Sequence, residues 1–146
     1  MRRRFTQQFG CASVLTLLCL LPTIAPTTAQ AGSIDPERST VLITGSNRGI
    51  GLAFATHYVD AGWNVLATAR SPERAPELQA LADRYEHILV EQLDVTDNGR
   101  IAELATAYKD TSIDVLINNA GIAGDLEKQE WGSLDHSTFE QVMAVN

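Results

Sequence analysis

The loop TGSNRGIG occupies residues 44–51 and has the spacing G-x-x-x-G-x-G. It follows an apolar, β-branched run at 40–44 that predicts a buried strand, and it precedes residues 52–61, which predict a helix. A loop without bulky side chains at the start of a helix exposes backbone N–H groups and the positive end of the helix dipole. This setting favours a phosphate-binding site over a plain tight turn, for which the same glycines would also serve.

Outward from this loop, apolar runs alternate with amphipathic segments. The predicted strands are 40–44, 64–68, 87–93 and 113–117. The predicted helices are 52–61 with Gly62 as its stop, one capped by Ser71, one capped by Thr96, and one opened by the capping box Ser137–Glu140. Strict alternation predicts an α/β fold, a Rossmann-like doubly wound parallel sheet. We expect about four strands and four helices, the N-terminal portion of such a sheet.

The end of the second predicted strand bears on which dinucleotide the loop would bind. A site for NAD places an acidic residue about 20 residues beyond the glycines, where it bonds the ribose hydroxyls. Here the strand ends in Thr68, Ala69 and Arg70, and Arg48 lies inside the loop. Two arginines and a missing carboxylate favour NADP over NAD, because a guanidinium pairs with a 2′-phosphate. The alternative is that both arginines are solvated surface residues.

Two more motifs follow strands at the same predicted edge of the sheet. Asp94 ends the third strand, where it could accept from an adenine amino group or cap the next helix. The motif NNAG, residues 118–121, ends the fourth strand, and its amides could be simple turn formers. Ligands bind at this edge in doubly wound sheets, so the motifs together favour a nucleotide site.

The motifs TGSNRGIG, LDV, NNAG and VMAVN stand in this order in the chain. In that order they resemble the signatures of the classical short-chain dehydrogenase/reductase family. The wording GSNRGIGLAFA, NVLATAR and IDVLINNAGIAG is similar to the carbonyl-reductase-like branch that includes sniffer and C-factor proteins. The resemblance covers residues 40–146. It implies an NADP-dependent oxidoreductase that transfers hydride between the nicotinamide and a small carbonyl or alcohol substrate, and that in its complete form could be a homo-oligomer.

The resemblance also assigns roles to individual residues. Asn146 corresponds to the family's catalytic asparagine, which holds a water linked to the catalytic lysine. The amide of Asn146 shares a predicted helix face with Phe139, Val142 and Met143, so it needs a polar partner. The loop 122–134, with Trp131, would border the pocket entrance. The cofactor-binding residues implied are Gly45, Asn47, Arg48, Gly49, Ile50, Gly51, Arg70, Asp94, Val95, Asn119, Ala120 and Gly121. No metal site is predicted.

The family's catalytic Tyr-x-x-x-Lys does not occur in these 146 residues. The positions four beyond Tyr58, Tyr85 and Tyr108 are Gly62, Leu89 and Ser112. We therefore expect a fragment that is inactive by itself, lacking this pair and the family's serine. The alternatives are a non-enzymatic NADP-binding or signalling protein of the C-factor kind, an inactive truncated pseudoenzyme, and a methyltransferase. NNAG and Arg70 argue against the methyltransferase.

Residues 1–31 predict an export signal that precedes a domain at 32–146. Arg2, Arg3 and Arg4 form a positive start, residues 12–24 are mostly apolar, and Ala29-Gln30-Ala31 offers a cleavage site after Ala31. The paired arginines before Phe5 partly match a twin-arginine signal. We expect a periplasmic or extracellular protein; an uncleaved anchor or a mis-assigned start codon are the alternatives.

Charge and cysteine usage exclude several other classes. Cys11 and Cys19 both lie in the predicted signal, so the mature chain would have neither disulfides nor thiolate chemistry. The net charge is −7, and loss of the three signal arginines would bring it to −10. Such a surface disfavours nucleic acids and anionic membranes as partners, so no nucleic-acid partner is expected. Once the signal is cleaved, no stable membrane anchor is expected either.

Overall fold

A computed structural model describes residues 33–126, 132 and 135–146. The predicted signal at 1–31 and Trp131 lie outside the described residues. The elements in order are β1 (Thr40–Ile43), α1 (Gly49–Asp60), β2 (Asn64–Ala69), the 3₁₀ turn η1 (Pro72–Arg74), α2 (Pro76–Ala82), β3 (Ile88–Gln92), α3 (Asn98–Ala107), β4 (Val115–Ile117) and α4 (His136–Val145).

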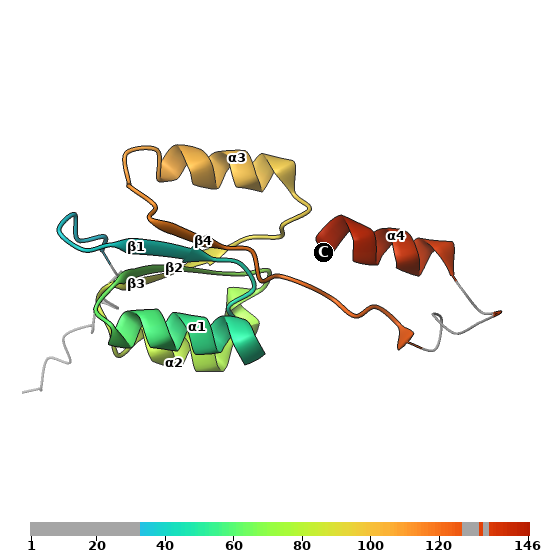
Figure 1. The fold of residues 1–146 in the computed structure, drawn as a ribbon, viewed down its shortest axis with the longest axis horizontal. Helices are drawn as coiled ribbons and strands as arrows, with labels where there is room; N and C mark the ends of the chain where they lie inside the picture. The colour runs from blue at the N-terminus through green and yellow to red at the C-terminus, as the bar shows by residue number, and fades with distance from the viewer. Residues whose placement is uncertain (1–32, 127–131, 133–134) are drawn as a thin grey trace, which may run out of the picture.

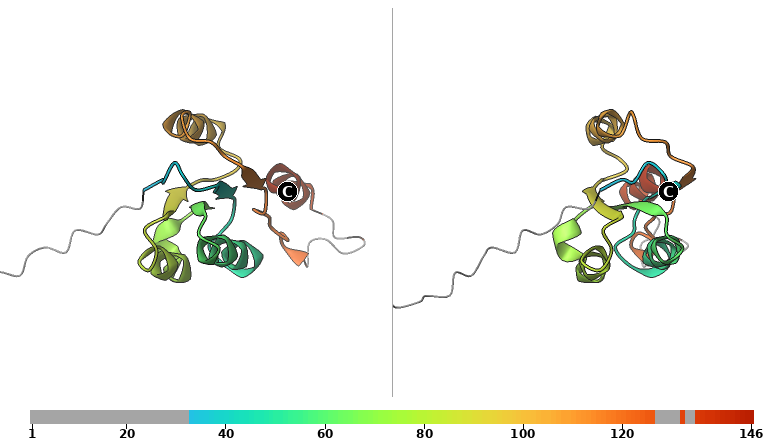
Figure 2. Two further views of the ribbon diagram at one scale, coloured as in Figure 1. Left: turned by 60° about the vertical axis from the view of Figure 1, so that its left-hand side comes forward. Right: turned by 90° about the vertical axis from the view of Figure 1, so that its left-hand side faces the viewer.

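The four strands form one parallel sheet in the order β3-β2-β1-β4. α1 and α2 cover one face and α3 lies over the other, while α4 stands apart on the side to which the carboxyl ends of the strands point (Figures 1 and 2). This arrangement confirms the predicted α/β, Rossmann-like sheet with four strands and four α-helices. No helix in the described part of the chain is both long and apolar enough to cross a bilayer.

The hydrophobic core lies between the sheet and the pair α1 and α2. Parallel register aligns Val41 with Val65 and Ile43 with Ala67, so their side chains point to the same face. All six residues of β2 are buried, as expected of a strand that has neighbours on both sides and helices on both faces. Leu78 and Leu81 of α2 complete this core.

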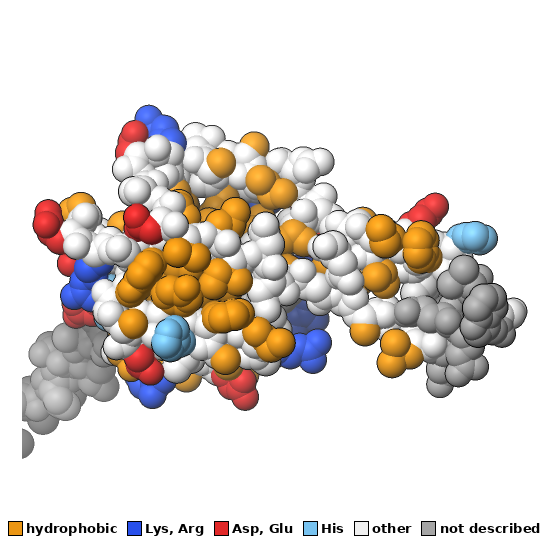
Figure 3. All heavy atoms as spheres, in the orientation of Figure 1, with side chains coloured by type: hydrophobic (Ala, Val, Ile, Leu, Met, Phe, Trp, Pro, Cys, Tyr) orange, Lys and Arg blue, Asp and Glu red, His pale blue; other side chains and the backbone are white. Residues whose placement is uncertain are grey.

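The β4 side of the sheet is much less covered. No residue of β4 is fully buried, and Leu116 is 59% exposed on the face that points away from α1. On the face turned toward the viewer, Figure 3 shows hydrophobic side chains gathered between the sheet and α1. The strand is also shorter than predicted: it begins at Val115, so Ile113 and Asp114 precede it.

α3 is fixed to β3 by a polar cluster around Glu91. The Tyr108 hydroxyl donates to Glu91 Oε1 at 2.7 Å, and Arg100 Nη2 lies 2.9 Å from Glu91 Oε2. Arg100 Nε donates in addition to the carbonyl of Gln92 at 2.8 Å. These bonds hold the turn between β3 and α3, which carries Asp94.

Three predicted helix caps are wrong, whereas the predicted stop is confirmed. α2 begins at Pro76 after the 3₁₀ turn, and Ser71 makes no capping bond. Asp97 caps α3 in place of Thr96, and Asp135 caps α4 in place of Ser137. A carboxylate accepts an N–H at a helix start more strongly than a hydroxyl does. Gly62, at φ +82°, ends α1 as predicted.

Candidate functional site

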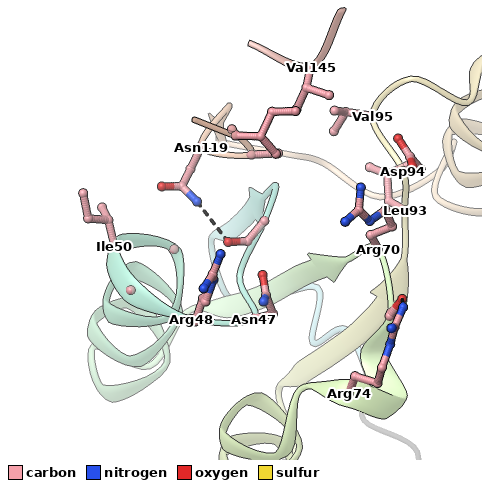
Figure 4. A pocket seen from close by; sticks show the side chains of 17 residues that line it. Asn47, Arg48, Ile50, Arg70, Arg74, Leu93, Asp94, Val95, Asn119 and Val145 are labelled. Atoms are coloured by element: carbon pink, nitrogen blue, oxygen red, sulfur yellow. Dashed lines mark hydrogen bonds between the residues drawn. The ribbon is translucent and has the colours of Figure 1, made fainter. Parts of the chain in front are cut away.

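A groove of about 720 Å³ lies at the carboxyl ends of the strands. The glycine loop, the tips of β2 and β3, and the segment after β4 form its walls (Figure 4). All twelve predicted cofactor-binding residues line this groove. Five residues beyond the predicted cofactor-binding set also line it, namely Ser71, Arg74, Leu93, Ile122 and Val145. Of these, Ile122 begins the loop 122–134 that was expected to border the pocket entrance.

The glycine loop turns sharply into α1 and leaves that helix start open to the groove. Ser46 fixes the turn, because its N–H donates to Thr68 O at 2.7 Å and its hydroxyl donates to Ile43 O at 3.0 Å. α1 begins at Gly49, inside the loop and three residues earlier than predicted. Its N-cap, Arg48, makes no side-chain capping bond, and the first turn has no acidic residue. The first N–H groups of this helix are therefore available to an anion.

Two glycines let the loop lie directly on the start of the helix. A Cβ at Gly51 would lie 2.2 Å from Gly45 O and 2.5 Å from Asn119 Nδ2, well inside van der Waals contact. Gly45 has φ +68°, and a Cβ there would lie 2.8 Å from Ala120 Cα. The close approach of loop, helix and β4 tip thus requires glycine at both positions.

Thr44 and Asn119 join the glycine loop to the tip of β4. The N–H groups of Asn119 and Ala120 both donate to Thr44 Oγ1 at 3.0 Å. In return, Asn119 Nδ2 donates to the carbonyls of Thr44 and Gly45, each at 3.0 Å. No role was predicted for Thr44. A hydroxyl at the end of the strand before the loop, paired with an amide at the end of another strand, is the signal that could have found it.

Three arginines and one aspartate give the groove its charge. Arg48 and Arg70 line it as predicted, and Arg74 joins them from η1. Asp94 closes a turn rather than capping α3, because Thr96 donates to Asp94 Oδ1 with its N–H at 3.0 Å and its hydroxyl at 2.7 Å. These bonds, and to a smaller extent Arg70, hold the pKa of Asp94 below its ordinary value. At neutral pH the groove therefore combines three positive charges with one carboxylate.

The backbone of Ile122 supplies the polar partner that the side-chain amide of Asn146 requires. Its Oδ1 accepts from Ile122 N at 2.9 Å and its Nδ2 donates to Ile122 O at 3.1 Å. The face expected to bury this residue is open, since Phe139 is 51% and Met143 is 63% exposed. The structure thus gives Asn146 a bridging position between α4 and the segment after β4. Its catalytic role stays a prediction.

Comparison with known proteins places this fold and groove in a family. The family profile described as short chain dehydrogenase matches residues 39–146. Chlorophyll(ide) b reductase NOL of Arabidopsis thaliana is 37% identical over 131 residues, which are 82% of this chain and 37% of that protein. NADP-dependent 3-hydroxy acid dehydrogenase YdfG of Salmonella typhi is 41% identical over 100 residues, which are 65% of this chain and 38% of that protein.

Solved structures agree with the sequence relatives. A carbonyl reductase from Pseudomonas aeruginosa PAO1 in complex with NADP superposes with a TM-score of 0.66 at 36% identity, covering 70% of this chain and 47% of that one. NADPH-bound carbonyl reductase from chicken fatty liver gives a TM-score of 0.62 at 35% identity, covering 79% and 44%. The chain spans less than half the length of each of these four proteins. Because the family profile matches residues 39–146, which include the glycine loop and the NNAG tip, the chain belongs to the short-chain dehydrogenase family.

Proposed function

We propose that this chain forms the cofactor-binding part of an NADP-dependent oxidoreductase that interconverts a small carbonyl compound and its alcohol. The observation that carries the proposal is the groove, in which the open start of α1 faces a space lined by Arg48, Arg70 and Arg74. A diphosphate fits the N–H groups at the helix start, and an additional phosphate fits the arginines. The complexes of two solved relatives with NADP or NADPH support the same ligand.

Different residues of the groove would bind the diphosphate, fix the glycine loop and limit the access of water. Gly49, Ile50 and Gly51 offer backbone N–H groups to the diphosphate, and the bonds between Thr44 and Asn119 keep the loop in place. Ile122 and Val145 line the groove and reduce the access of water to it. When bound, NADPH supplies the hydride. The acid or base that exchanges a proton with the substrate oxygen is not assigned to any residue of this chain.

Titration calorimetry of the intact protein tests the proposal. We expect NADPH to bind in the micromolar range or tighter and at least about tenfold more tightly than NADH, a difference of about 1.4 kcal/mol. S-adenosylmethionine serves as the comparison ligand, since methyltransferases also use glycine loops in similar sheets. Binding of S-adenosylmethionine with no binding of NADPH would replace the oxidoreductase by a methyltransferase.

A second candidate is a non-enzymatic NADP-binding protein, for which the same nucleotide groove would serve. No tyrosine of the 146 residues is followed four positions later by lysine. We expect this polypeptide by itself to bind NADPH without oxidising it in the presence of aldehydes or ketones. Steady loss of NADPH absorbance with any carbonyl substrate would contradict that expectation. An in-frame Tyr-x-x-x-Lys in the coding sequence after Asn146 would favour the enzyme.

Export is a separate proposal and concerns residues 1–31. It is supported by the arginine-rich start, the apolar run and the Ala29-Gln30-Ala31 site. Mass spectrometry of the N-terminus after expression in a bacterial host should find a chain that begins at Gly32. A chain that retains Met1 or Arg2 would contradict cleavage.

A further inference from the structure

Ser71 and Arg74 form a bonded pair that lines the groove beside Arg70. Arg74 Nη2 donates to Ser71 Oγ at 2.7 Å, and the backbone N–H of Arg74 donates to Ser71 O at 3.0 Å. Figure 4 shows Arg70 and Arg74 near the end of β2, apart from Arg48 and Asn47 in the glycine loop. Neither Ser71 nor Arg74 belongs to the motifs in the glycine loop or at the strand ends.

We propose that Arg74, positioned by Ser71, is a specificity-determining residue that binds the 2′-phosphate by which NADP differs from NAD. This inference rests on the proposed function, since it concerns the same groove and the same nucleotide. It adds a third cation to the two that the sequence predicted, and it makes Ser71 the residue that holds this cation in place.

The backbone under Arg74 is firmly placed although its side chain reaches into solvent. Arg74 ends the 3₁₀ turn η1, and the next residue, Ala75, is only 2% exposed. Ala75 N donates to Pro72 O at 3.0 Å, and Leu78, one turn further, is fully buried. An arginine on an anchored turn loses little backbone freedom when it binds an anion, so more of the interaction energy appears as affinity.

The hydrogen-bonding capacity of the pair suits a phosphate dianion. A hydroxyl has one proton and two lone pairs, so Ser71 can accept from Arg74 and still donate its own proton. A guanidinium has five N–H donors, of which Ser71 accepts one. The pair therefore offers a hydroxyl and several charged N–H groups to one ligand, and such charge-assisted bonds are the stronger kind.

The neighbouring charges favour Arg74 as a phosphate partner. Arg70 already acts on Asp94, whose pKa it helps to lower after the bonds from Thr96. The ion pair of Arg74 in the described part of the chain is an exposed one with Glu73, with Nε and Oε1 3.5 Å apart and side chains 77% and 69% exposed. Solvent screens such a pair, so a phosphate can replace Glu73 at little cost.

Calorimetry with 2′,5′-ADP and 5′-AMP tests the inference, because these probes differ only in the 2′-phosphate. In the intact protein we expect Arg74→Gln to lower the affinity for 2′,5′-ADP by about tenfold or more and to change the affinity for 5′-AMP by less than about twofold. Ser71→Ala should lower the affinity for 2′,5′-ADP by about threefold, because Arg74 keeps its charge but loses the hydrogen bond that orients its side chain. Glu73→Gln should strengthen 2′,5′-ADP slightly.

Arg84→Gln is the matched control, since it makes the same change of charge at an exposed residue outside the groove. It should alter neither ligand by more than about twofold. If Arg74→Gln leaves the affinity for 2′,5′-ADP unchanged, or lowers the affinity for both probes equally, the inference is wrong. The proposed function would still stand in that case, provided that the wild-type protein prefers NADPH. If the wild-type protein binds no NADPH, the proposed function itself fails.

Discussion

The two walls of the groove are built from very different parts of the molecule. The first wall, formed by the glycine loop and the tip of β2, rests on a strand buried at all six positions and on the core beneath α1 and α2. The second wall, formed by the segment after β4 and the end of α4, rests on elements that bury little. β4 has no fully buried residue, and Thr138 is the buried residue of α4.

This difference indicates which wall supplies the affinity for phosphates and which wall responds to changes in sequence or pH. The first wall is held by packing, which changes little when a ligand arrives. The second wall is joined to the first by a few polar bonds, chiefly those between Thr44 and Asn119, and α4 is joined to it by the Asn146–Ile122 pair. We therefore expect the first wall to fix the phosphates and the second to respond to substitutions and to pH.

The largest effect is expected where the two walls touch. A methyl group at Gly51 would overlap both Gly45 O and Asn119 Nδ2. Gly51→Ala should lower the affinity for NADPH by more than about 100-fold, or about 2.8 kcal/mol, as measured by calorimetry.

Gly62→Ala is the control for this change. Gly62 has a positive φ, which Gly51 does not have, and a Cβ at Gly62 would meet nothing within 4 Å. It should cost about 1–2 kcal/mol of stability and leave NADPH affinity unchanged. Equal losses of affinity in the two variants would show that contact between the walls is unimportant.

The second prediction compares a leucine under each wall. Leu78 is fully buried below the first wall, whereas Leu116 of β4 is 59% exposed. Leu78→Ala should lower the free energy of unfolding in urea by about 2–5 kcal/mol, because it leaves a cavity. Leu116→Ala should cost less than about 1 kcal/mol. A loss at Leu116 as large as that at Leu78 would break the comparison and show that β4 is covered in solution.

The sequence predicted the first wall better than the second. Its strands are continuous apolar runs and its loop is rich in glycine, so local pattern and tertiary packing agree. Residues 93–95 and 118–121 were placed correctly at the same edge because parallel strands end together. The expected apolar face of α4 is largely exposed, because periodicity indicates a hydrophobic stripe but not whether anything covers it.

Two of the three errors at the helix starts share one physical cause. Hydroxyls at 96 and 137 look like caps in the sequence, yet each donates to a nearby aspartate instead. Competition between a hydroxyl and a carboxylate for the same N–H groups is decided by charge, which a motif such as the capping box does not weigh. Arg74 was missed for a different reason, since a 3₁₀ turn, rather than the first turn of α2, presents it to the groove.

The third prediction removes the polar bonds between the walls without changing volume much. Thr44→Val leaves the N–H groups of Asn119 and Ala120 without their acceptor. We expect a loss of about 2 kcal/mol in unfolding free energy, because two donors at a partly buried position lose their partner. Thr44→Ser keeps the oxygen and should lose less than half as much. If valine and serine behave alike in urea titrations, the hydroxyl does not hold the walls together.

The smallest effect concerns pH and the start of α4. The Ser137 hydroxyl, the Thr138 hydroxyl and Thr138 N–H donate to Asp135 Oδ2 at 2.6, 2.7 and 3.0 Å, and they hold the pKa of Asp135 well below its ordinary value of 3.8. A carboxyl with a lowered pKa in the folded state stabilises that state at pH values above 3.8. This contribution fades as the pH falls below 3.8 toward the folded-state value.

Hydrogen exchange at the Thr138 amide measures this contribution, because that N–H donates directly to the carboxylate. In the wild-type protein, protection should be constant from pH 7 to about pH 5 and should decrease below about pH 4, after correction for the intrinsic exchange rate. Asp135→Asn keeps an acceptor at the cap but has no proton to gain, so its protection should be lower and should not fall in that range. Protection of the core amide of Leu66, on the buried strand β2, should not share the dependence on Asp135. If it does, α4 and the first wall unfold together and the two walls are one cooperative unit.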